Sequence, residues 1–414
     1  MNLITDVENF ARGLEAKWSG WRVRLSAAVS DLENRVDPER FKIVIDLIER
    51  AHAQAEETLR TGRMPTGQHV PWELAHGLSL LDRLGDREAL PRRPDELATR
   101  VLPDGSLLGC RQWELLDYRW TEALVAWLEN LDHPARFNTT PALLTMPNDV
   151  VLAIAGDWGT GPFERNAPAT LVAAVIGKIA PDYSFHLGDV YYAGTQSEEK
   201  NNMQAWPHGK SGAFTLNSNH EMYSGAKAYF AELERHFPRQ QNTSYFALQN
   251  DHWLVIGLDS AYASDPLNLY MDGKLNRAQI DWLRGLPKDK AVIVMSHHQP
   301  YDIDGNKSTE LYTQVVAALG SVPAYWYWGH LHNSIWYQPK AGMHGRCAGH
   351  GSIPYGVASE LGGKANVVWY ETQKAGDRNY PERVLNGCMK VVLSGDTITE
   401  QFIGEDGSAR WPRA

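Results

Sequence analysis

The sequence has few cysteines and no long apolar run, and these two absences exclude several classes of protein. Among 414 residues only Cys110, Cys347 and Cys388 are cysteines, and they are widely spaced. This arrangement provides neither a disulfide framework nor the paired cysteines of a zinc ribbon. No segment approaches the roughly 18 consecutive apolar residues of a membrane-spanning helix. The first residues also lack a basic segment followed by an apolar one, so we expect a cytoplasmic protein with no membrane partner.

An excess of basic charge is missing as well. The chain has 40 Lys and Arg residues against 50 Asp and Glu residues, which gives a formal net charge of −10. Proteins bind duplex nucleic acid through basic surfaces that displace counterions, so this balance argues against such a partner. The chain does contain many carboxylates and 15 histidines. These side chains suit a site for hard metal ions better than a thiolate cluster.

The pattern of apolar residues changes near residue 145, which indicates two units. In residues 1–145 the apolar residues follow helical spacing. One segment runs from the cap residue Asp37 through Pro38 to Gly62, and a second covers Arg111–Leu131. We therefore expect an all-helical N-terminal region that acts as a lid, in packing, or in oligomerisation, including formation of a homo-oligomer. Its spacing shows no catalytic motif.

Residues 146–414 have short apolar strands that alternate with helices. The expected strands are 150–155, 183–187, 253–258, 291–295 and 324–328, and the expected helices include 167–179 and 226–236. Alternation of this kind predicts an α/β architecture, in which polar residues after the strands line the ligand-binding edge. Residues 389–403 read as a β-hairpin that completes the second sheet of a sandwich.

Five short motifs stand at or near the ends of these strands. In chain order they are Gly156-Asp157-Trp158-Gly159, Gly188-Asp189-Val190-Tyr191-Tyr192, Asn219-His220-Glu221, His297-His298-Gln299-Pro300 and Gly329-His330-Leu331-His332. Each motif alone is common in unrelated loops. Their combination in this order points to one shared site.

The ordered set resembles the calcineurin-like metallophosphoesterase superfamily and, within it, the purple acid phosphatase branch. The resemblance covers about residues 149–335. Much of the superfamily begins with Asp-x-His, but here Gly159 stands at the histidine position, and Tyr192 follows Asp189 by three residues. In purple acid phosphatases these two departures occur together, because the tyrosine replaces the missing ligand. The implied fold is a β-sandwich flanked by helices, with residues 146–414 as a dinuclear-metal phosphoesterase domain.

The resemblance also implies the residues of the site. One metal ion would be bound by Asp157, Asp189, Tyr192 and His332, and Asp189 would bridge to a second ion bound by Asn219, His297 and His330. His220 would lie beside the phosphate, where it would donate a proton to the leaving group or stabilise the transition state.

Two details of this assignment depart from the family pattern or stay open. Ungapped alignment with the family's His-His-Pro-Pro favours His297 as the ligand, as does the spacing from Val294. Counting back two residues from Pro300 favours His298 instead. We favour His297. Ser218 replaces the glycine that usually precedes Asn219.

The implied activity is hydrolysis of a small-molecule phosphate ester by a metal-bound hydroxide, without a covalent enzyme intermediate. A phosphomonoesterase is favoured. The alternatives are a phosphodiesterase acting on cyclic nucleotides or other diesters, and a catalytically inactive metal-binding scaffold. Two ions roughly 3.5–4 Å apart bind phosphoryl oxygens and lower the pKa of a bound water. The ligand types suit iron paired with iron, manganese or zinc. The ions also supply local positive charge, so a net charge of −10 does not oppose an anionic substrate.

Overall fold

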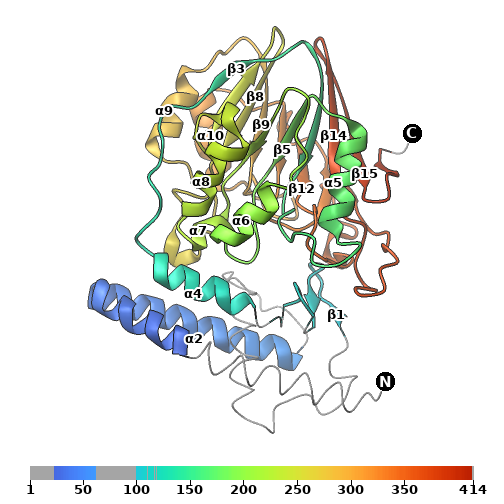
Figure 1. Cartoon of the computed structure of the whole chain (residues 1–414). Helices are drawn as coiled ribbons and strands as arrows, with labels where there is room; N and C mark the ends of the chain where they lie inside the picture. The colour runs from blue at the N-terminus through green and yellow to red at the C-terminus, as the bar shows by residue number, and fades with distance from the viewer. Residues whose placement is uncertain (1–22, 62–98, 110, 116, 118, 413–414) are drawn as a thin grey trace.

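The computed structural model describes residues 23–61, 99–109, 111–115, 117 and 119–412. Two β-sheets packed face to face form the centre of this part of the chain, and helices cover their outer faces (Figure 1). This α/β sandwich confirms the fold class expected from the sequence.

The larger sheet has eight strands, four of which are mutually parallel neighbours at its centre, β8, β9, β10 and β12. Across the sheet the order is β13 (Val367–Tyr370), β11 (Ser334–Tyr337), β12 (His344–Ala348), β10 (Tyr325–Trp328), β9 (Ala291–Ser296), β8 (Trp253–Leu258), β7 (Phe246–Gln249) and β3 (Leu143–Thr145).

The smaller sheet has six strands, and β4, β5 and β6 run parallel within it. Across the sheet the order is β16 (Ala409–Trp411), β15 (Thr397–Gly404), β14 (Gly387–Ser394), β4 (Asp149–Ala155), β5 (Tyr183–His186) and β6 (Gly212–Thr215). The antiparallel pair β14–β15 confirms the hairpin expected near the C-terminus.

The helices follow the strands in the alternation expected from the sequence. The α-helices after β4 are α5 (Pro168–Ile179), α6 (Gln196–Met203), α7 (Asn219–Tyr223), α8 (Lys227–His236), α9 (Arg277–Gly285) and α10 (Glu310–Leu319). The described part of the chain also includes the short 3-10 helices η2 (Pro238–Gln240), η3 (Pro266–Asn268) and η4 (Ser359–Leu361). Among the described residues, no helix combines the length and the apolar composition needed to cross a lipid bilayer.

Alternation along the strands explains how the sheets are buried on both faces. In β4, Leu152 and Ile154 face the eight-stranded sheet, whereas Ala153 and Ala155 face the side covered by α5. Successive side chains of a strand point to opposite faces, so large residues fill the space between the sheets and small ones admit the helix. All four side chains are fully buried.

The N-terminal region differs from the all-helical expectation. Residues 23–35 are helical, and α2 (Pro38–Thr61) and α4 (Trp120–Asn130) fall inside the two predicted helical segments. Between them, β1 (Arg100–Val101) pairs with β2 (Leu107–Leu108). After α4, β3 joins the eight-stranded sheet beside β7. The predicted helix end at Gly62 lies outside the described residues.

The predicted second helix begins later than expected because acidic side chains bind the backbone before it. The Glu114 carboxylate accepts a hydrogen bond from the amide of Arg111 at 2.9 Å, and that of Asp117 accepts one from the amide of Trp113 at 2.9 Å. Side-chain acceptors of this kind offer the backbone an alternative to helical hydrogen bonds. The regular helix therefore starts only at Trp120.

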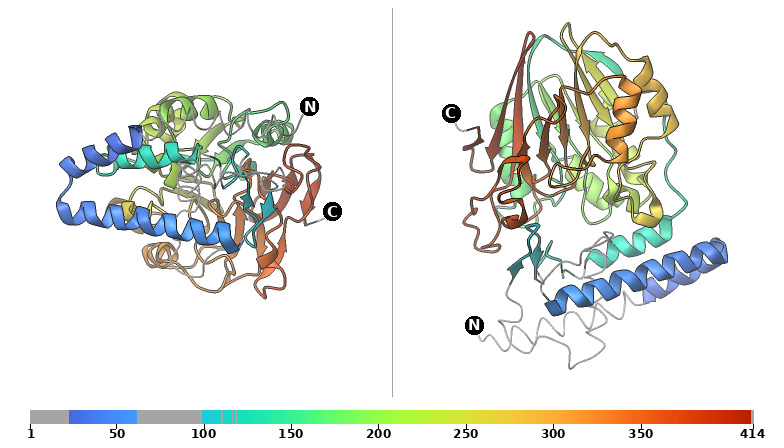
Figure 2. Two further views of the ribbon diagram at one scale, coloured as in Figure 1. Left: turned by 90° about the horizontal axis from the view of Figure 1, so that it is seen from below. Right: turned by 180° about the vertical axis from the view of Figure 1, so that it is seen from behind.

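Helices α2 and α4 lie across one end of the sandwich, the end where α7 is found (Figures 1 and 2). Helix α4 contacts α7, and α2 contacts η3. The indole of Trp127 donates a hydrogen bond to the carbonyl of Pro266 at 3.0 Å, and Arg35 donates to the carbonyl of Leu128 at 2.6 Å. The N-terminal region is therefore packed onto the sandwich at the carboxyl ends of its parallel strands.

Candidate metal centre

Most of the expected site residues follow the carboxyl ends of parallel strands. Asp157 follows β4, Asp189 follows β5, Asn219 begins the helix after β6, His297 follows β9 and His330 follows β10. Parallel strands end at the same edge of a sheet, so these loops meet. The structure brings six of the seven expected metal ligands together there, and Tyr192 is the exception.

Asp157, Asp189 and His332 form the first group. Each contributes a ligand atom, and these atoms lie within 4.8 Å of one another. Nε2 of His332 is 3.3 Å from Oδ1 of Asp157 and 3.6 Å from Oδ2 of Asp189. All three side chains are buried. Two carboxylates and an imidazole at this spacing could hold a divalent or trivalent cation.

Asn219, His297 and His330 form the second group. Nε2 of His297 lies 2.8 Å from Oδ1 of Asn219 and 3.1 Å from Nδ1 of His330. The amide nitrogen of Asn219 donates to the hydroxyl of Tyr223 at 3.1 Å, which leaves its carbonyl oxygen facing the group. Oδ1 of Asp189 lies 3.3 Å from Nε2 of His297, while Oδ2 faces the first group. Asp189 thus presents one oxygen to each group.

The hydrogen bonds of His297 and His298 distinguish the two histidines. The Nδ1 of His297 donates to the carbonyl of Leu187 at 2.9 Å, so the lone pair on Nε2 points into the second group. A backbone partner on one nitrogen is how proteins orient metal-binding histidines. A ring nitrogen of His298 also lies within 4.8 Å of ligand atoms of His297 and His330, so these three histidines could form a metal-binding group. In His298, however, Nε2 donates to the carbonyl of Tyr270 at 2.8 Å and Nδ1 contacts the hydroxyl of Ser260 at 2.8 Å. Both of its nitrogens are occupied by protein partners, which supports His297 as the ligand.

The tyrosine that reaches the site is Tyr191, and this corrects the placement expected for Tyr192. The Tyr191 hydroxyl lies 2.9 Å from Oδ2 of Asp189 and 3.0 Å from Nε2 of His332. The Tyr192 hydroxyl instead donates to Oδ2 of Asp117 at 2.5 Å. Burial and the neighbouring Asp117 hold the pKa of Tyr192 well above its usual range, so the phenol keeps its proton. Its side chain is turned away from Asp189 because the N-terminal region provides its partners.

Gly159 is required where the superfamily pattern has a histidine. A Cβ at Gly159 would lie 2.2 Å from the carbonyl oxygen of Asp189, closer than any side chain permits. The amide of Gly159 donates to that same oxygen at 3.0 Å, and its own carbonyl accepts from the amide of Tyr191 at 3.1 Å. The loops carrying Asp157 and Asp189 therefore approach each other directly, and the phenol of Tyr191 lies against both carboxylates.

His220 lies beside the first group and outside both sets of ligand atoms. Its Nδ1 donates to the main-chain carbonyl of Tyr192 at 2.8 Å, and its Nε2 lies 3.8 Å from Oδ2 of Asp189. The ring is only 2% exposed. An imidazole fixed by one nitrogen and directed toward the site by the other could transfer a proton there.

Ser218 is a site residue that the sequence identified only as a departure from the family pattern. As the N-cap of α7 its hydroxyl accepts a hydrogen bond from the amide of His220 at 3.1 Å. The same hydroxyl donates to Oδ1 of Asp189 and also contacts the Glu221 carboxylate. Ser218 thus links the Asn219 loop to the shared carboxylate. The serine at this position was the sequence feature that could have indicated this role, since a glycine has no hydroxyl to make these bonds.

The electrostatics of the site favour bound cations. Burial, followed by the charge of Asp189, raises the pKa of Asp157 well above its usual range. Burial also opposes ionisation of Asp189, but His297 and His220 outweigh it and keep the pKa of Asp189 well below its usual value. Burial lowers the pKa of His297 to about 3, so this imidazole stays neutral and able to bind a metal. Burial thus opposes ionisation of both carboxyl groups, and a bound cation would supply the positive charge that buried anions require.

Backbone conformation sets the loops apart from ordinary turns. Asp157, Asp189, His330 and His332 have φ angles of 56°, 73°, 68° and 50°, in the left-handed region that residues other than glycine rarely adopt. Such conformations cost roughly 1–3 kcal/mol each and persist where packing enforces them, most often at functional sites. Gly329 fits tightly here, because a Cβ at this position would lie 2.5 Å from Oδ2 of Asp157.

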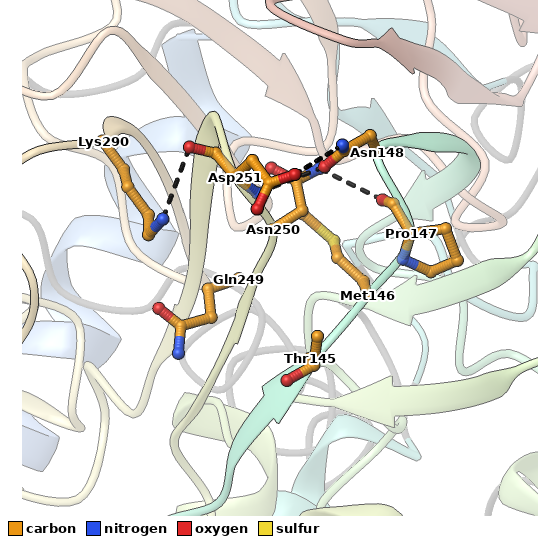
Figure 3. Close-up of a pocket in the computed structure, with 8 residues that line it drawn as sticks. All are labelled: Thr145, Met146, Pro147, Asn148, Gln249, Asn250, Asp251 and Lys290. Atoms are coloured by element: carbon orange, nitrogen blue, oxygen red, sulfur yellow. Dashed lines mark hydrogen bonds between the residues drawn. The ribbon is translucent and has the colours of Figure 1, made fainter.

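A separate surface hollow lies at the opposite edge of the sheets. It has a volume of about 470 Å³ and is lined by residues 145–148, residues 249–251 and Lys290. These residues precede β4, β8 and β9, so the hollow is at the amino ends of those strands. Figure 3 shows Asn148 bonded to the side chain of Asp251 and Lys290 to its main chain. None of the expected site residues takes part in it.

Part of the chain matches a known protein family. Residues 150–334 match the family model of the calcineurin-like phosphoesterases. No curated protein sequence matches the chain. Solved structures give three examples of similarity. GAP50, described as the anchor in the inner membrane complex of Plasmodium, is 15% identical over 64% of this chain and 87% of that chain, with a TM-score of 0.44. A dimetal phosphatase from Danio rerio is 12% identical over 62% of this chain and 96% of that chain, with a TM-score of 0.43.

The third is a conserved uncharacterized protein from Streptococcus pneumoniae, described as a predicted phosphoesterase. It is 12% identical over 65% of this chain and 96% of that chain, with a TM-score of 0.31. The family match spans the loops from Asp157 to His332, which the structure assembles into one cluster. Residues 150–334 of this chain therefore match the calcineurin-like phosphoesterase family model across the loops that form the candidate metal centre.

Proposed function

We propose that this protein is a metal-dependent hydrolase of phosphate esters, with small-molecule phosphomonoesters as its substrates and a purple acid phosphatase-like site. One observation carries the proposal. Asp189 presents Oδ1 to His297 and Oδ2 to His332, so a single carboxylate serves two adjacent groups of ligand atoms. A shared carboxylate between two cation sites is suited to dinuclear phosphoester hydrolysis.

The residues divide between the two ions as follows. Asp157, His332 and the hydroxyl of Tyr191 would hold one ion, Asn219, His297 and His330 would hold the other, and Asp189 would contact both. When bound, the ions would neutralise phosphoryl oxygens and lower the pKa of an attacking water. A phenol together with carboxylates and imidazoles suits iron at the first position, and iron, manganese or zinc at the second.

His220 is the proposed proton donor. Departure of an alkoxide from phosphorus is slow unless the oxygen receives a proton. Since the carbonyl of Tyr192 occupies Nδ1, the proton would leave from Nε2, which faces Asp189. The side chains around it exclude bulk water, because His220, Asp189 and His297 are each at most 2% exposed. A low-dielectric surrounding strengthens the interaction of these groups with a charged phosphate.

Burial of the site supports a compact substrate. Five of the six proposed ligand residues other than the tyrosine are buried, and His330 is partly exposed. A small phosphomonoester requires room for one alcohol only, whereas a diester requires room for two. We therefore place phosphomonoesters first.

The experiment is metal analysis of the purified full-length chain followed by hydrolysis of p-nitrophenyl phosphate and bis(p-nitrophenyl) phosphate. Samples are loaded separately with iron, manganese and zinc. We expect about two metal ions per chain and faster hydrolysis of the monoester. Faster hydrolysis of the diester would assign a phosphodiesterase. A folded protein that binds no metal under any loading condition would overturn the proposal, and one that binds metal but hydrolyses neither ester would indicate a scaffold.

A further inference from the structure

Tyr192 lies between the N-terminal region and the proposed proton donor, and its side chain contacts the N-terminal region. Its ring stacks on Trp113 with centroids 4.4 Å apart and meets the edge of Trp120 at 4.7 Å. Its hydroxyl donates to Asp117 at 2.5 Å and accepts a weaker contact from Arg119 at 3.4 Å. These four partners all lie in residues 113–120, which we call the docking segment.

The main chain of Tyr192 contacts His220, the proposed proton donor. The carbonyl oxygen of Tyr192 accepts the hydrogen bond from Nδ1 of His220 at 2.8 Å. The amide of Tyr192 donates to the carboxylate of Glu198 at 2.6 Å, which fixes the plane of the preceding peptide. The amide of Ala193, which shares a peptide with the Tyr192 carbonyl, also donates to Glu198, at 3.3 Å. Because the backbone and side chain of one residue move together, the contacts of the docking segment act with these bonds on the position of the carbonyl oxygen.

The docking segment also contacts His220 directly. The ring of Trp120 lies 5.9 Å from the ring of His220, between centroids. Tyr191 and Tyr223 complete the surroundings of the imidazole, at 4.6 Å and 5.0 Å. Trp120 is 1% exposed and its indole donates to the carbonyl of Glu114 at 3.0 Å, so it is fixed within the segment. One wall of the pocket around His220 is therefore supplied from outside the family-matched residues.

We propose that Tyr192 is a positioning residue through which the docking segment orients His220 for proton transfer. An imidazole that donates a proton from Nε2 carries protons on both nitrogens, and the hydrogen bond from Nδ1 to the Tyr192 carbonyl then holds the ring with its Nε2 proton directed toward the substrate. A misplaced carbonyl lets the ring rotate, and rates of proton transfer fall steeply with misorientation. This inference rests on the proposed function, because it concerns how the proton donor of that reaction is held.

The first test uses substrates that differ in how much they need a proton. Hydrolysis of an alkyl phosphate releases an alkoxide, a poor leaving group that depends on the proton donor. Hydrolysis of p-nitrophenyl phosphate releases p-nitrophenolate, which leaves with little need of a proton. Tyr192→Phe removes one hydroxyl and keeps the ring and the main chain. We expect kcat for an alkyl phosphate to fall about five- to tenfold, the range expected for one lost hydrogen bond, and kcat for p-nitrophenyl phosphate to fall less than about twofold. Equal loss on both substrates, or no loss on either, would overturn the proposal.

A double-mutant cycle tests whether Tyr192 acts through His220. With His220→Ala as the background, the donor is already absent, so adding Tyr192→Phe should cause no further loss of kcat on the alkyl phosphate. Additive losses would show that Tyr192 acts by another route and would refute its positioning role.

Three further variants separate positioning from general loosening of the segment. Asp117→Asn keeps an oxygen that can accept from Tyr192 and should restore most of the substrate-dependent activity lost in Asp117→Ala. Thr99→Val is the matched control, because it also removes one hydroxyl bond, from Thr99 to Glu114 at 2.7 Å, without touching Tyr192. We expect Thr99→Val to leave the ratio of the two kcat values unchanged, and a change equal to that of Tyr192→Phe would contradict the proposal.

Failure of this inference is distinguishable from failure of the proposed function. Each variant is analysed for bound metal, which should equal that of the original protein. If the original protein hydrolyses neither ester, the proposed function has failed. If it hydrolyses both the alkyl phosphate and p-nitrophenyl phosphate, and Tyr192→Phe leaves the ratio of the two kcat values unchanged, only the positioning role has failed.

Discussion

Asp189 and His297 meet at the boundary between the two halves of the site, with Oδ1 of Asp189 3.3 Å from Nε2 of His297. The opposite oxygen of the same carboxylate lies 2.9 Å from the hydroxyl of Tyr191. The side chains of Asp189 and His297 are both fully buried. A carboxylate in this position is the one group whose loss should disturb both ions at once.

Replacement of Asp189 tests that relationship. Asp189→Asn keeps the shape of the side chain and removes its charge, so both cations lose a shared anionic ligand. We expect metal content to fall from about two ions per chain to nearly none and hydrolysis to be lost. Metal analysis after dialysis provides the measurement. Asp149→Asn, at the amino end of β4, is the control and should retain both ions. A variant at position 189 that keeps two ions would refute the bridging role.

A pair of substitutions tests which adjacent histidine binds metal. His297→Gln should release one ion, because the Nε2 lone pair directed at Asn219 and His330 is lost. His298→Gln should keep both ions and lower the free energy of unfolding by about 1–3 kcal/mol, since buried hydrogen bonds to Ser260 and Tyr270 are lost. Metal content and urea denaturation measured on both variants decide the question. The reverse pattern would assign the ligand to His298.

Removal of His220 tests the proton donor. His220→Ala leaves every proposed metal ligand in place, so metal content should stay the same. Turnover should fall by about 10²–10⁴, the usual contribution of a general acid. Steady-state kinetics on an alkyl phosphate measures the effect. Full activity in this variant would exclude the assigned role.

The two adjacent tyrosines should differ in their spectroscopic effect. If iron(III) occupies the first group, a phenol bound to it produces a visible charge-transfer band. Tyr191→Phe should abolish that band, whereas Tyr192→Phe should leave it in place, because the Tyr192 hydroxyl is bonded to Asp117. Absorption spectra of the iron-loaded proteins make the comparison. Loss of the band in Tyr192→Phe alone would restore the assignment made from the motif.

His186 should make the metal-free protein sensitive to acid. Burial lowers the pKa of this fully buried imidazole to about 3, whereas an unfolded histidine titrates near 6.5. Between these values the unfolded chain binds a proton that the folded chain does not, so stability falls as the pH falls. The loss is about 1.4 kcal/mol per pH unit.

The variant His186→Gln removes this titration and can still bond to Thr215. Urea denaturation of the metal-free proteins between about pH 6.5 and 4.5 should show a shallower decline for the variant. Identical slopes in the two proteins would contradict the assignment of this acid sensitivity to His186.

The local pattern of apolar residues was enough to locate strands of both sheets. Strands such as 150–155 and 291–295 were predicted within one or two residues, because apolar runs bounded by glycine and polar residues reflect burial on both faces. Asp157, Asp189 and His330 could be assigned to one edge, since parallel strands end together. The beginning of α4 could not be located, because the competing bonds from Glu114 and Asp117 depend on the folded loop.

The sequence by itself determined the chemical types of the proposed ligands and their order along the chain, because these are properties of residues and of strand ends. Only the tertiary structure decided which of two adjacent tyrosines faces the carboxylates. Tyr191 and Tyr192 are neighbours in a loop with no repeating period, and the choice follows from Asp117, 75 residues earlier in the chain. The same contact placed the N-terminal region against the proposed proton donor, and no local pattern encodes a contact across that distance.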